Sequence, residues 1–347
     1  SSVDDWASIS VLVHCVCLKD FKGACVLRLD RKICGMENKI PSWPDCAADL
    51  INVAAGRTAA DLVIVGGKVA NVHTREILRW DVAIKSSRFA YVGPDASHCI
   101  GPNTEVLETD GFVLPGFCDG HMHIESGMLT PAEFARAVIP HGTTTMFTDP
   151  HEIANVMGLD GVKLMHDEGL QQPINIFTQM PSCAPSAPGL ETTGFEISSE
   201  DVAEAMHWPG IIGLGEMMNF PGVINSDPQM LAEMKATARA GKTIGGHYAS
   251  PDLGPAFHAY AAGGPADDHE GTCEQDAIAR VRQGMRSMMR LGSAWYDVKT
   301  QITAITEKKL DSRNFILCTD DSHSGTLVNH GHINRVIRHA IECGCDP

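Results

Sequence analysis

Residues 111–123 read GFVLPGFCDGHMH, an apolar run that ends in the pattern His121-x-His123. The run has the length and composition of a β-strand, and side chains two residues apart in a strand point to the same side. Both imidazoles can therefore reach one metal ion. Read alone, the pair is better explained as a polar strand end with two solvated histidines. The polar ends of later segments favour an active site at the end of this strand.

Seven further segments have strand character, and most of them end in histidine, glutamate or aspartate. They are Thr143–Thr148, Ile174–Met180, Ile211–Gly215, Lys242–Gly246, Ala266–Asp268, Arg286–Arg290 and Asn314–Thr319. Helical patterns lie between most of them. Thr130-Pro131 with Glu133 predicts a capping box that opens one helix, which should stop at His141-Gly142. Asp227-Pro228 and Gly241 mark the two ends of another.

Eight strands alternating with helices predict a parallel (β/α)8 TIM-type barrel of class α/β, in which functional residues lie at the carboxyl ends of the strands. An open doubly wound sheet is the competing architecture. However, no Gly-x-Gly-x-x-Gly pattern or phosphate-binding loop follows any strand. We therefore expect the barrel to comprise residues 115–347.

A different pattern precedes the barrel. Residues 46–114 contain short β-rich runs separated by turn residues, and predict a small β-rich, sandwich-like domain. These runs are Asp61–Gly67, Trp80–Lys85, Phe89–Gly93 and Thr104–Glu108. Residues 1–45 end in the breaker cluster Pro41-Ser42-Trp43-Pro44. We interpret them as an N-terminal extension of unclear structure.

Composition limits the possible partners. The 347 residues are 44% hydrophobic and 20% charged, as in globular proteins, with a formal net charge of −16. Such an acidic chain is a poor ligand for nucleic acid or an anionic membrane, so a small neutral substrate is favoured. The twelve cysteines form no Cys-x-x-Cys pair, which indicates a reducing compartment. No apolar run approaches the ~18 residues of a membrane helix. We expect a soluble, cytoplasmic protein.

Six side chains at the predicted strand ends are candidate metal ligands. They are His121, His123, Glu216, His247, His269 and Asp320. Each alone could be a loop histidine, a surface carboxylate or a helix cap, but such roles have no reason to select strand ends. Together they could hold two divalent ions, usually ~3.5–4 Å apart, with Glu216 as the bridge. Because no cysteine is among them, the site suits Mn²⁺, Fe²⁺ or Zn²⁺.

Several longer motifs resemble the amidohydrolase superfamily, and within it the adenine deaminase family more closely. The motifs are Pro115–Ser126, His141–Thr145, Asp149–Val156, Gly213–Asn219 and Asp268–Glu270. The resemblance implies metal-dependent hydrolysis of adenine to hypoxanthine and ammonia in purine metabolism. It also implies that His121, His123 and Asp320 hold one ion and that His247 and His269 hold the other. Many relatives bridge the ions with a carboxylated lysine, whereas Glu216 matches the adenine deaminases.

The expected mechanism assigns roles to the remaining polar residues. Two cations would make hydroxide available near neutral pH for attack at C6 of the purine. Asp320 would act first as base and then as acid, and Glu270 would deliver a proton to the ring. His151, Glu152 and Asp321 are expected to bind the substrate. The alternatives are an amidohydrolase acting on another amino-purine or a cyclic amide, and a catalytically silent scaffold.

The end of the chain raises a further expectation. In proteins of this resemblance, strands that follow the barrel join the β-rich segment before it. Here the sequence stops at Pro347, shortly after the helix that follows the eighth strand. We therefore expect a C-terminally truncated chain whose early strands have unpaired edges and an exposed apolar face. Such a chain would tend to aggregate or to pair with another chain, and a homo-oligomer is expected.

Overall fold

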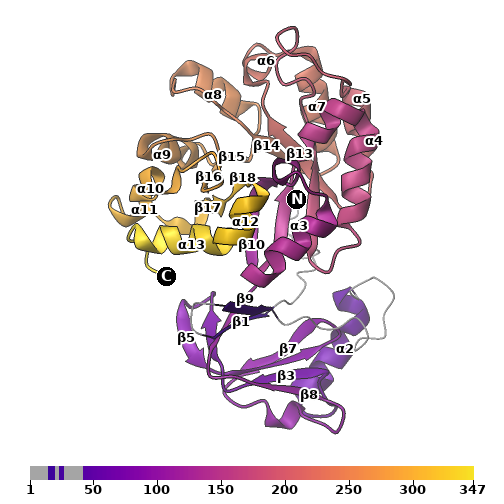
Figure 1. Ribbon diagram of the computed structural model, residues 1–347, viewed down its shortest axis with the longest axis vertical. Coiled ribbons are helices and arrows are strands. Elements are labelled where there is room, and N and C mark those ends of the chain that lie inside the picture. Colours follow the sequence, from indigo (N-terminus) through magenta and orange to yellow (C-terminus); the bar gives the residue numbers. More distant parts are fainter. Residues whose placement is uncertain (1–14, 20–22, 27–41) are drawn as a thin grey trace. The chain divides into compact units, whose positions relative to one another are not determined.

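A computed structural model describes residues 15–19, 23–26 and 42–347 (Figure 1). The chain divides into two compact units. Unit 1 comprises Ser1–Phe117 and Ile139–Thr144, and unit 2 comprises Cys118–Val138 and Thr145–Pro347. Much of the predicted N-terminal extension, residues 1–45, lies outside the described residues. The division into segments 1–45, 46–114 and 115–347 stays a prediction.

The described part of unit 1 contains two β-sheets. One has the order β2-β1-β9-β4-β5 and the other the order β7-β6-β3-β8. The first contains β1 (Cys15–Lys19), β2 (Gly23–Val26), β4 (Lys68–Asn71), β5 (Glu76–Arg79) and β9 (Phe112–Pro115). The second contains β3 (Leu62–Val65), β6 (Asp81–Lys85), β7 (Arg88–Gly93) and β8 (Glu105–Glu108). The strands predicted between residues 61 and 108 thus pair with one another, and β1 pairs with β9.

Alternation along β3 explains how this unit is packed. Leu62 and Ile64 point to one face, where Val69 and Val113 of the other sheet complete a buried cluster. Val63 points to the opposite face and packs with Val53 of α2 (Trp43–Ala54). The strand is therefore buried on both faces, which accounts for its continuous apolar sequence.

Helix α2 corrects our interpretation of Pro41–Pro44 as a breaker cluster. Pro44 lies in the first turn of the helix, after Ser42 at the N-cap position. In that turn the backbone N–H has no intrahelical partner, so proline costs little and its fixed φ suits the helix. The proline signal was real, but it marked the beginning of a helix.

The seven strands predicted after His123 are all present, within two residues of the predicted bounds. The run 111–123, which we predicted as one strand, is instead two strands in different sheets, β9 and β10 (Phe117–His123). The parallel strands are β10, β11 (Thr143–Thr148), β12 (Asn175–Met180), β13 (Ile211–Met217), β14 (Thr243–Gly246), β15 (Asp267–Asp268), β16 (Arg286–Arg290), β17 (Phe315–Cys318) and β18 (Asp320–Asp321). One sheet has the order β14-β13-β12-β11-β10-β18 and the other β15-β16-β17. β17 and β18 are two pieces of the predicted eighth strand, and β18 pairs with β10. The order is that of a TIM-like α/β fold.

Strands β14 and β15 lie in different sheets, and we call the junction between them the seam. Across it, the Ala266 N–H donates to the Ile244 carbonyl at 2.8 Å. The Gly246 N–H donates to the Asp267 carboxylate at 3.1 Å. His247 and His269 follow directly on the two sides of this seam.

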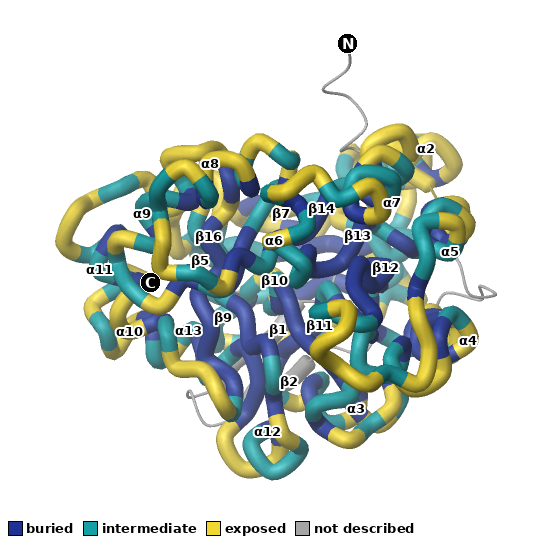
Figure 2. Tube along the Cα trace, turned by 90° about the horizontal axis from the view of Figure 1, so that it is seen from above, coloured by how far each residue is buried: buried dark blue, intermediate teal, exposed yellow. Residues whose placement is uncertain are grey.

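Helices alternate with the parallel strands, and their outer faces are exposed while the strands are buried (Figure 2). They are α3 (Pro131–Val138), α4 (His151–Gly169), α5 (Ser199–Ala205), α6 (Phe220–Ile224), α7 (Pro228–Arg239), α8 (Pro255–Ala262), α9 (Glu274–Arg282), α10 (Val298–Gln301), α11 (Thr303–Thr306), α12 (Ser324–His330) and α13 (Ile333–Glu342). No helix in the described part of the chain is long and apolar enough to cross a membrane.

Two helix starts test the capping predictions. Asp227 caps α7 as predicted, because its side chain accepts from the Gln229 and Met230 N–H groups. The capping box predicted with Glu133 is wrong. The Ala132 N–H at the start of α3 donates to Glu168 of α4 at 3.1 Å instead. Glu133 pairs with Arg136, so a neighbouring helix supplies the cap that we expected from the local sequence.

Candidate metal and active site

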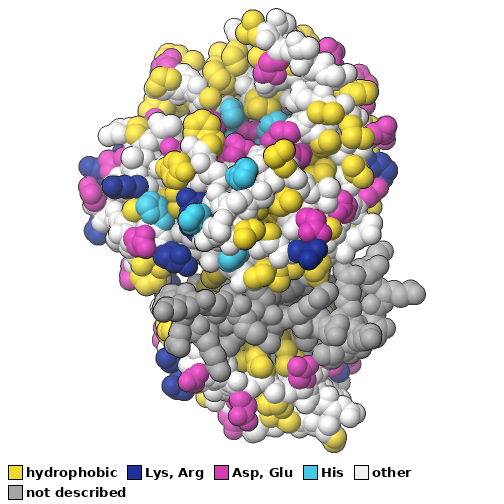
Figure 3. All heavy atoms as spheres, viewed as in Figure 1, with side chains coloured by type: hydrophobic (Ala, Val, Ile, Leu, Met, Phe, Trp, Pro, Cys, Tyr) yellow, Lys and Arg dark blue, Asp and Glu magenta, His cyan; other side chains and the backbone are white. Residues whose placement is uncertain are grey.

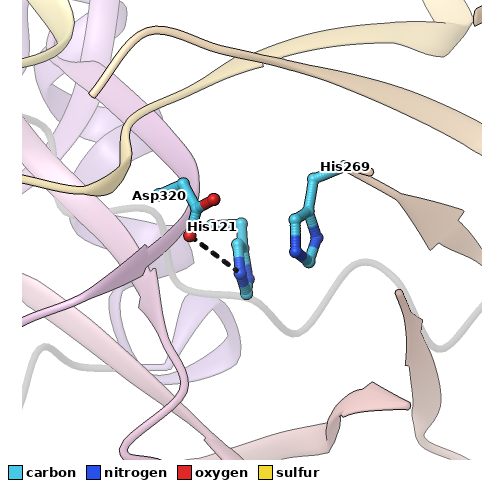
Figure 4. Close-up of side chains that lie close together, drawn as sticks. All are labelled: His121, His269 and Asp320. Carbon is cyan, nitrogen blue, oxygen red and sulfur yellow. Dashed lines mark ion pairs between the residues drawn. The ribbon is translucent and has the colours of Figure 1, made fainter. Parts of the chain in front are cut away.

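The six predicted ligands lie together at the carboxyl ends of the parallel strands, in unit 2. Five of them are at most 3% exposed, and His247 is partly exposed. Figure 4 shows His121 and His269 side by side with Asp320, whose Oδ1 is 3.9 Å from His121 Nε2. On the face shown in Figure 3, histidine and acidic side chains are neighbours where the surface of this unit is hollowed.

Several triads in this cluster could hold a metal ion, because their ligand atoms lie within 4.8 Å of one another. Within residues 42–347 these triads are His121–His269–Asp320, His121–His123–Glu216, His123–His151–Glu152, Glu216–His247–His269 and Asp149–His151–Glu216. Every predicted ligand belongs to at least one triad, and Glu216 belongs to three. The overlap means that neighbouring ions would share ligands.

Both carboxylate oxygens of Glu216 lie close to histidine nitrogens. Its Oε1 lies 3.4 Å from His123 Nε2 and 3.1 Å from His151 Nδ1. Its Oε2 lies 2.9 Å from His269 Nε2 and also contacts His247. Oε2 also lies 3.9 Å from His121 Nε2, so each oxygen faces more than one candidate ligand.

The histidine pair on β10 is oriented by a main-chain carbonyl. His123 Nδ1 lies 2.8 Å from the Asp149 carbonyl oxygen, which can only accept a hydrogen bond. Nδ1 therefore carries a hydrogen. Burial opposes protonation of the ring, but Glu152, Asp320 and Glu216 outweigh it and hold the pKa of His123 well above its ordinary value, so Nε2 must release a proton before it can bind a metal ion. That Nε2 faces Asp320 Oδ1 at 3.2 Å and His121 Nε2 at 3.1 Å. This is the arrangement expected of a metal-binding imidazole.

The electrostatics of the cluster also fit bound cations. Burial, with help from His269 and His123, holds the pKa of His121 well below its ordinary value, so this ring is neutral. Burial opposes protonation of His269 too, but Glu216 outweighs it and raises the pKa to about 9. Burial would raise the pKa of Glu216, yet the surrounding histidines hold it well below its usual range. Buried carboxylates of this kind demand positive charge, which divalent ions would supply.

Three buried aspartates that sequence reasoning missed tie the strand ends together. Asp119 accepts from the Thr319 N–H at 3.0 Å, which joins β10 to the eighth strand just before Asp320. Asp149 accepts from the Glu216 N–H at 2.7 Å. Asp268 accepts from the Tyr248 N–H at 2.6 Å. Each aspartate lies one or two residues before a site histidine, and this recurring spacing is a signal that could have identified them.

The residues predicted to bind the substrate lie around the same cluster. His151 and Glu152 begin α4, and Glu152 Oε2 is 3.6 Å from His123 Nδ1. Glu270 Oε1 is 3.5 Å from His269 Nε2. Asp321 accepts from the Ser126 hydroxyl and, at 3.4 Å, from the Trp295 indole N–H. The structure thus brings His151 and Glu152, and also the predicted catalytic residue Glu270, next to candidate ligands, whereas the side chain of Asp321 contacts Ser126 and Trp295.

Glu125 is a further polar group that the sequence did not single out. Its Oε2 and that of Glu152 are buried and have no hydrogen-bond partner among the described residues. Burial, together with the charge of Glu152, raises the pKa of Glu125 to about 7. Unpartnered buried oxygens are rare in folded proteins, and they favour a ligand on this side of the cluster.

Comparison with known proteins decides the family. The profile of the amidohydrolase family matches residues 112–347, well over half of the chain. This chain belongs to the amidohydrolase family. Among its curated relatives, this amidohydrolase is 78% identical to "Adenine deaminase" of Ruegeria sp. (strain TM1040) over 88% of the chain and 51% of the relative. It is 54% identical to "Adenine deaminase" of Moorella thermoacetica over 86% of the chain and 50% of the relative.

The amidohydrolase therefore spans about half the length of the curated relatives that it matches. Among solved structures, an L-hydantoinase from Arthrobacter aurescens is 16% identical to it, with a TM-score of 0.40. That match covers 74% of this chain and 58% of the hydantoinase chain.

Proposed function

We propose that this amidohydrolase hydrolyses adenine to hypoxanthine and ammonia at a binuclear metal site, in purine salvage or catabolism. The observation that carries the proposal is the convergence of four histidines and two carboxylates in one buried cluster. The names of the relatives indicate the substrate: proteins 78% and 77% identical over 88% of the chain are adenine deaminases.

The candidate ligands divide into two sets. His121, His123 and Asp320 would hold one ion, His247 and His269 the other, and Glu216 would bridge them. The donors are nitrogen and oxygen only, which favours Mn²⁺ or Fe²⁺ and also permits Zn²⁺. When bound, the ions lower the pKa of a water molecule so that a nucleophile is available near neutral pH.

Asp320 is placed to move the proton in the hydrolysis. Its Oδ1 faces the histidine ligands, where the water must lie, and can take a proton from that water as the C6–O bond forms. It can then pass the proton to the amino nitrogen before the C6–N bond breaks. The leaving group is thus neutral ammonia, and the sum of the steps is adenine plus water giving hypoxanthine plus ammonia.

Glu270 and the neighbouring polar residues complete the proposal. Attack at C6 places electron density on ring nitrogen N1, and Glu270 would supply the proton that N1 needs. It would regain a proton from the C6 hydroxyl as the carbonyl group of hypoxanthine forms. His151, Glu152 and Asp321 would bind the remaining polar edge of the purine, opposite the reacting carbon. A cytoplasmic location and a homo-oligomeric assembly are also part of the proposal.

Turnover of competing substrates tests the function directly. The Mn²⁺-loaded chain should release ammonia from adenine at a kcat/KM at least 100-fold above that for adenosine, guanine or cytosine. E216A, which lacks the proposed bridge, is the matched inactive control. Faster release from guanine would assign another amino-purine as substrate. Hydrolysis of a cyclic amide such as dihydrouracil would assign that class, and no turnover at all would identify a silent scaffold.

A further inference from the structure

Arg290, the last residue of β16, is a buried cation inside the candidate active site. Its side chain is 1% exposed and contacts three carboxylates from three different segments. One terminal nitrogen donates to Glu270 and, at 3.0 Å, to Asp320 Oδ2. Nε donates to Asp297 at 3.0 Å, and the Trp295 ring covers the guanidinium at 4.5 Å. None of the candidate metal triads includes Arg290.

The two carboxylate oxygens of Asp320 have different partners. Oδ2 accepts from Arg290, so only Oδ1 is turned toward His121 and His123. The backbone of Asp320 is also unusual, because its φ of 58° lies in the left-handed region that residues other than glycine rarely adopt. A strained conformation persists only where its surroundings fix it, and Arg290 supplies such a contact.

We propose that Arg290 is the positioning residue that aligns Asp320 and Glu270 for their proton transfers. For its catalytic consequence this inference rests on the proposed function. The guanidinium is planar, so the bond from Nε to Asp297 fixes the directions in which the terminal nitrogen donates to Glu270 and Asp320. A lysine ammonium at this place would keep the charge but lose the fixed geometry. Arg290 would thus act through Asp320 and Glu270, without touching the metal ions itself.

Kinetics with chemical rescue test the alignment. R290A should bind as much Mn²⁺ per chain as the wild type, because all six candidate ligands remain. Its kcat for adenine should fall about 100-fold, the cost of roughly 1 Å of misplacement, with KM within threefold of the wild type. Guanidinium ion below denaturing concentration should restore kcat at least tenfold, and equal sodium chloride should not. R290K should recover less than the rescued R290A.

A thermal double-mutant cycle on the metal-free protein tests the contact without any turnover. R290M should lower the melting temperature of the wild type by about 6 °C more than it lowers that of D320N, since only the wild type retains the ion pair. R280A with D320N is the matched control. Arg280 is equally buried but pairs with Asp268, so its effect should be the same in both backgrounds.

The outcomes separate the two proposals. Wild-type kcat in R290A, failure of guanidinium rescue, or loss of metal together with activity would overturn the positioning role. An absent coupling between Arg290 and Asp320 would overturn it as well. If the wild type does not turn over adenine, the proposed function fails, and the thermal cycle still decides whether Arg290 fixes Asp320.

Discussion

Glu216 belongs to three of the candidate metal triads, and the first prediction concerns the loss of such ligands. H121A, H269A and E216A should each bind less Mn²⁺ and lose turnover, because each leaves an ion short of a ligand. Metal analysis of the purified variants measures the loss. H330A is the matched control, since His330 ends α12, is exposed and belongs to no candidate triad. Full metal occupancy with full activity in any one variant would remove that residue from the site.

Asp320 carries the second prediction. D320N should lower kcat by about 100-fold or more while KM changes little, because an amide oxygen can still fill a ligand position but cannot carry the proton. Steady-state kinetics with adenine separate the two parameters. A rise in KM with unchanged kcat would make Asp320 a binding residue and leave Glu270 as the next candidate for the proton carrier.

Single residues could be singled out from the sequence where a metal-binding residue type stands at the end of a predicted strand. His121, His123 and Asp320 were predictable because metal-binding residue types follow strand-like segments. Glu125 and Arg290 were not, because their roles depend on neighbours distant in the sequence. Arg290 acts through Glu270, 20 residues earlier, and Asp320, 30 residues later. No local pattern distinguishes such an arginine from one that ends a strand at the surface.

Among the elements, α7 carries a buried carboxylate whose ionisation should make the free energy of unfolding depend on pH. Glu233 is fully buried, and only one of its oxygens has a partner, Gln229 at 3.1 Å. Burial raises the pKa of this carboxyl from 4.5 to about 8. Between these values the folded chain keeps the proton that the unfolded chain releases, so the stability of the fold falls as pH rises.

E233Q should remove this pH dependence. The wild type should lose about 3 kcal/mol of unfolding free energy between pH 5 and pH 8 through this group, and E233Q should not. Urea unfolding at the two pH values measures the difference. E204Q, at an exposed position of α5, is the control and should behave as the wild type. Equal pH dependence in E233Q and the wild type would show that Glu233 is ionised in the fold.

The elements themselves were predictable to the extent that their signals are local. The bounds of β11 and β16 agree with the predicted segments Thr143–Thr148 and Arg286–Arg290. Helix α2 was missed because a proline in the first turn of a helix resembles a proline in a loop. The cap of α3 was wrong because Glu168, which supplies it, lies 36 residues away. Caps supplied by another helix leave no signature in the helix that they close.

For the whole molecule, the two compact units predict an uneven response to metal. All candidate ligands lie in unit 2. An ion that binds only the folded state stabilises it, by about 2.7 kcal/mol at a concentration 100 times its dissociation constant. Mn²⁺ should therefore raise the melting temperature of unit 2, and a chelator should reverse the shift.

The transition of unit 1 should be insensitive to Mn²⁺, which calorimetry can resolve. The H121A and E216A variants provide the control, because in them the metal-dependent shift of unit 2 should shrink. A single transition that moves as a whole would show that the two units unfold together. An unchanged melting temperature in the wild type at saturating Mn²⁺ would contradict the assignment of the metal site.

The seam between β14 and β15 is expected to open locally more often than the paired strands on either side of it. The N–H groups of Gly246 and His247 donate to side chains. Such amides open more easily than those between two paired strands, so hydrogen–deuterium exchange in metal-free protein should be faster at residues 244–247 and 266–269 than at β12. His247 and His269 lie on the two sides of the seam, so an ion bound by both would hold the two sides together. Metal should then slow exchange at these amides far more than at β12, where ladders on both sides already protect the backbone. If metal slows exchange equally along all strands, the seam is as stable as the paired strands beside it.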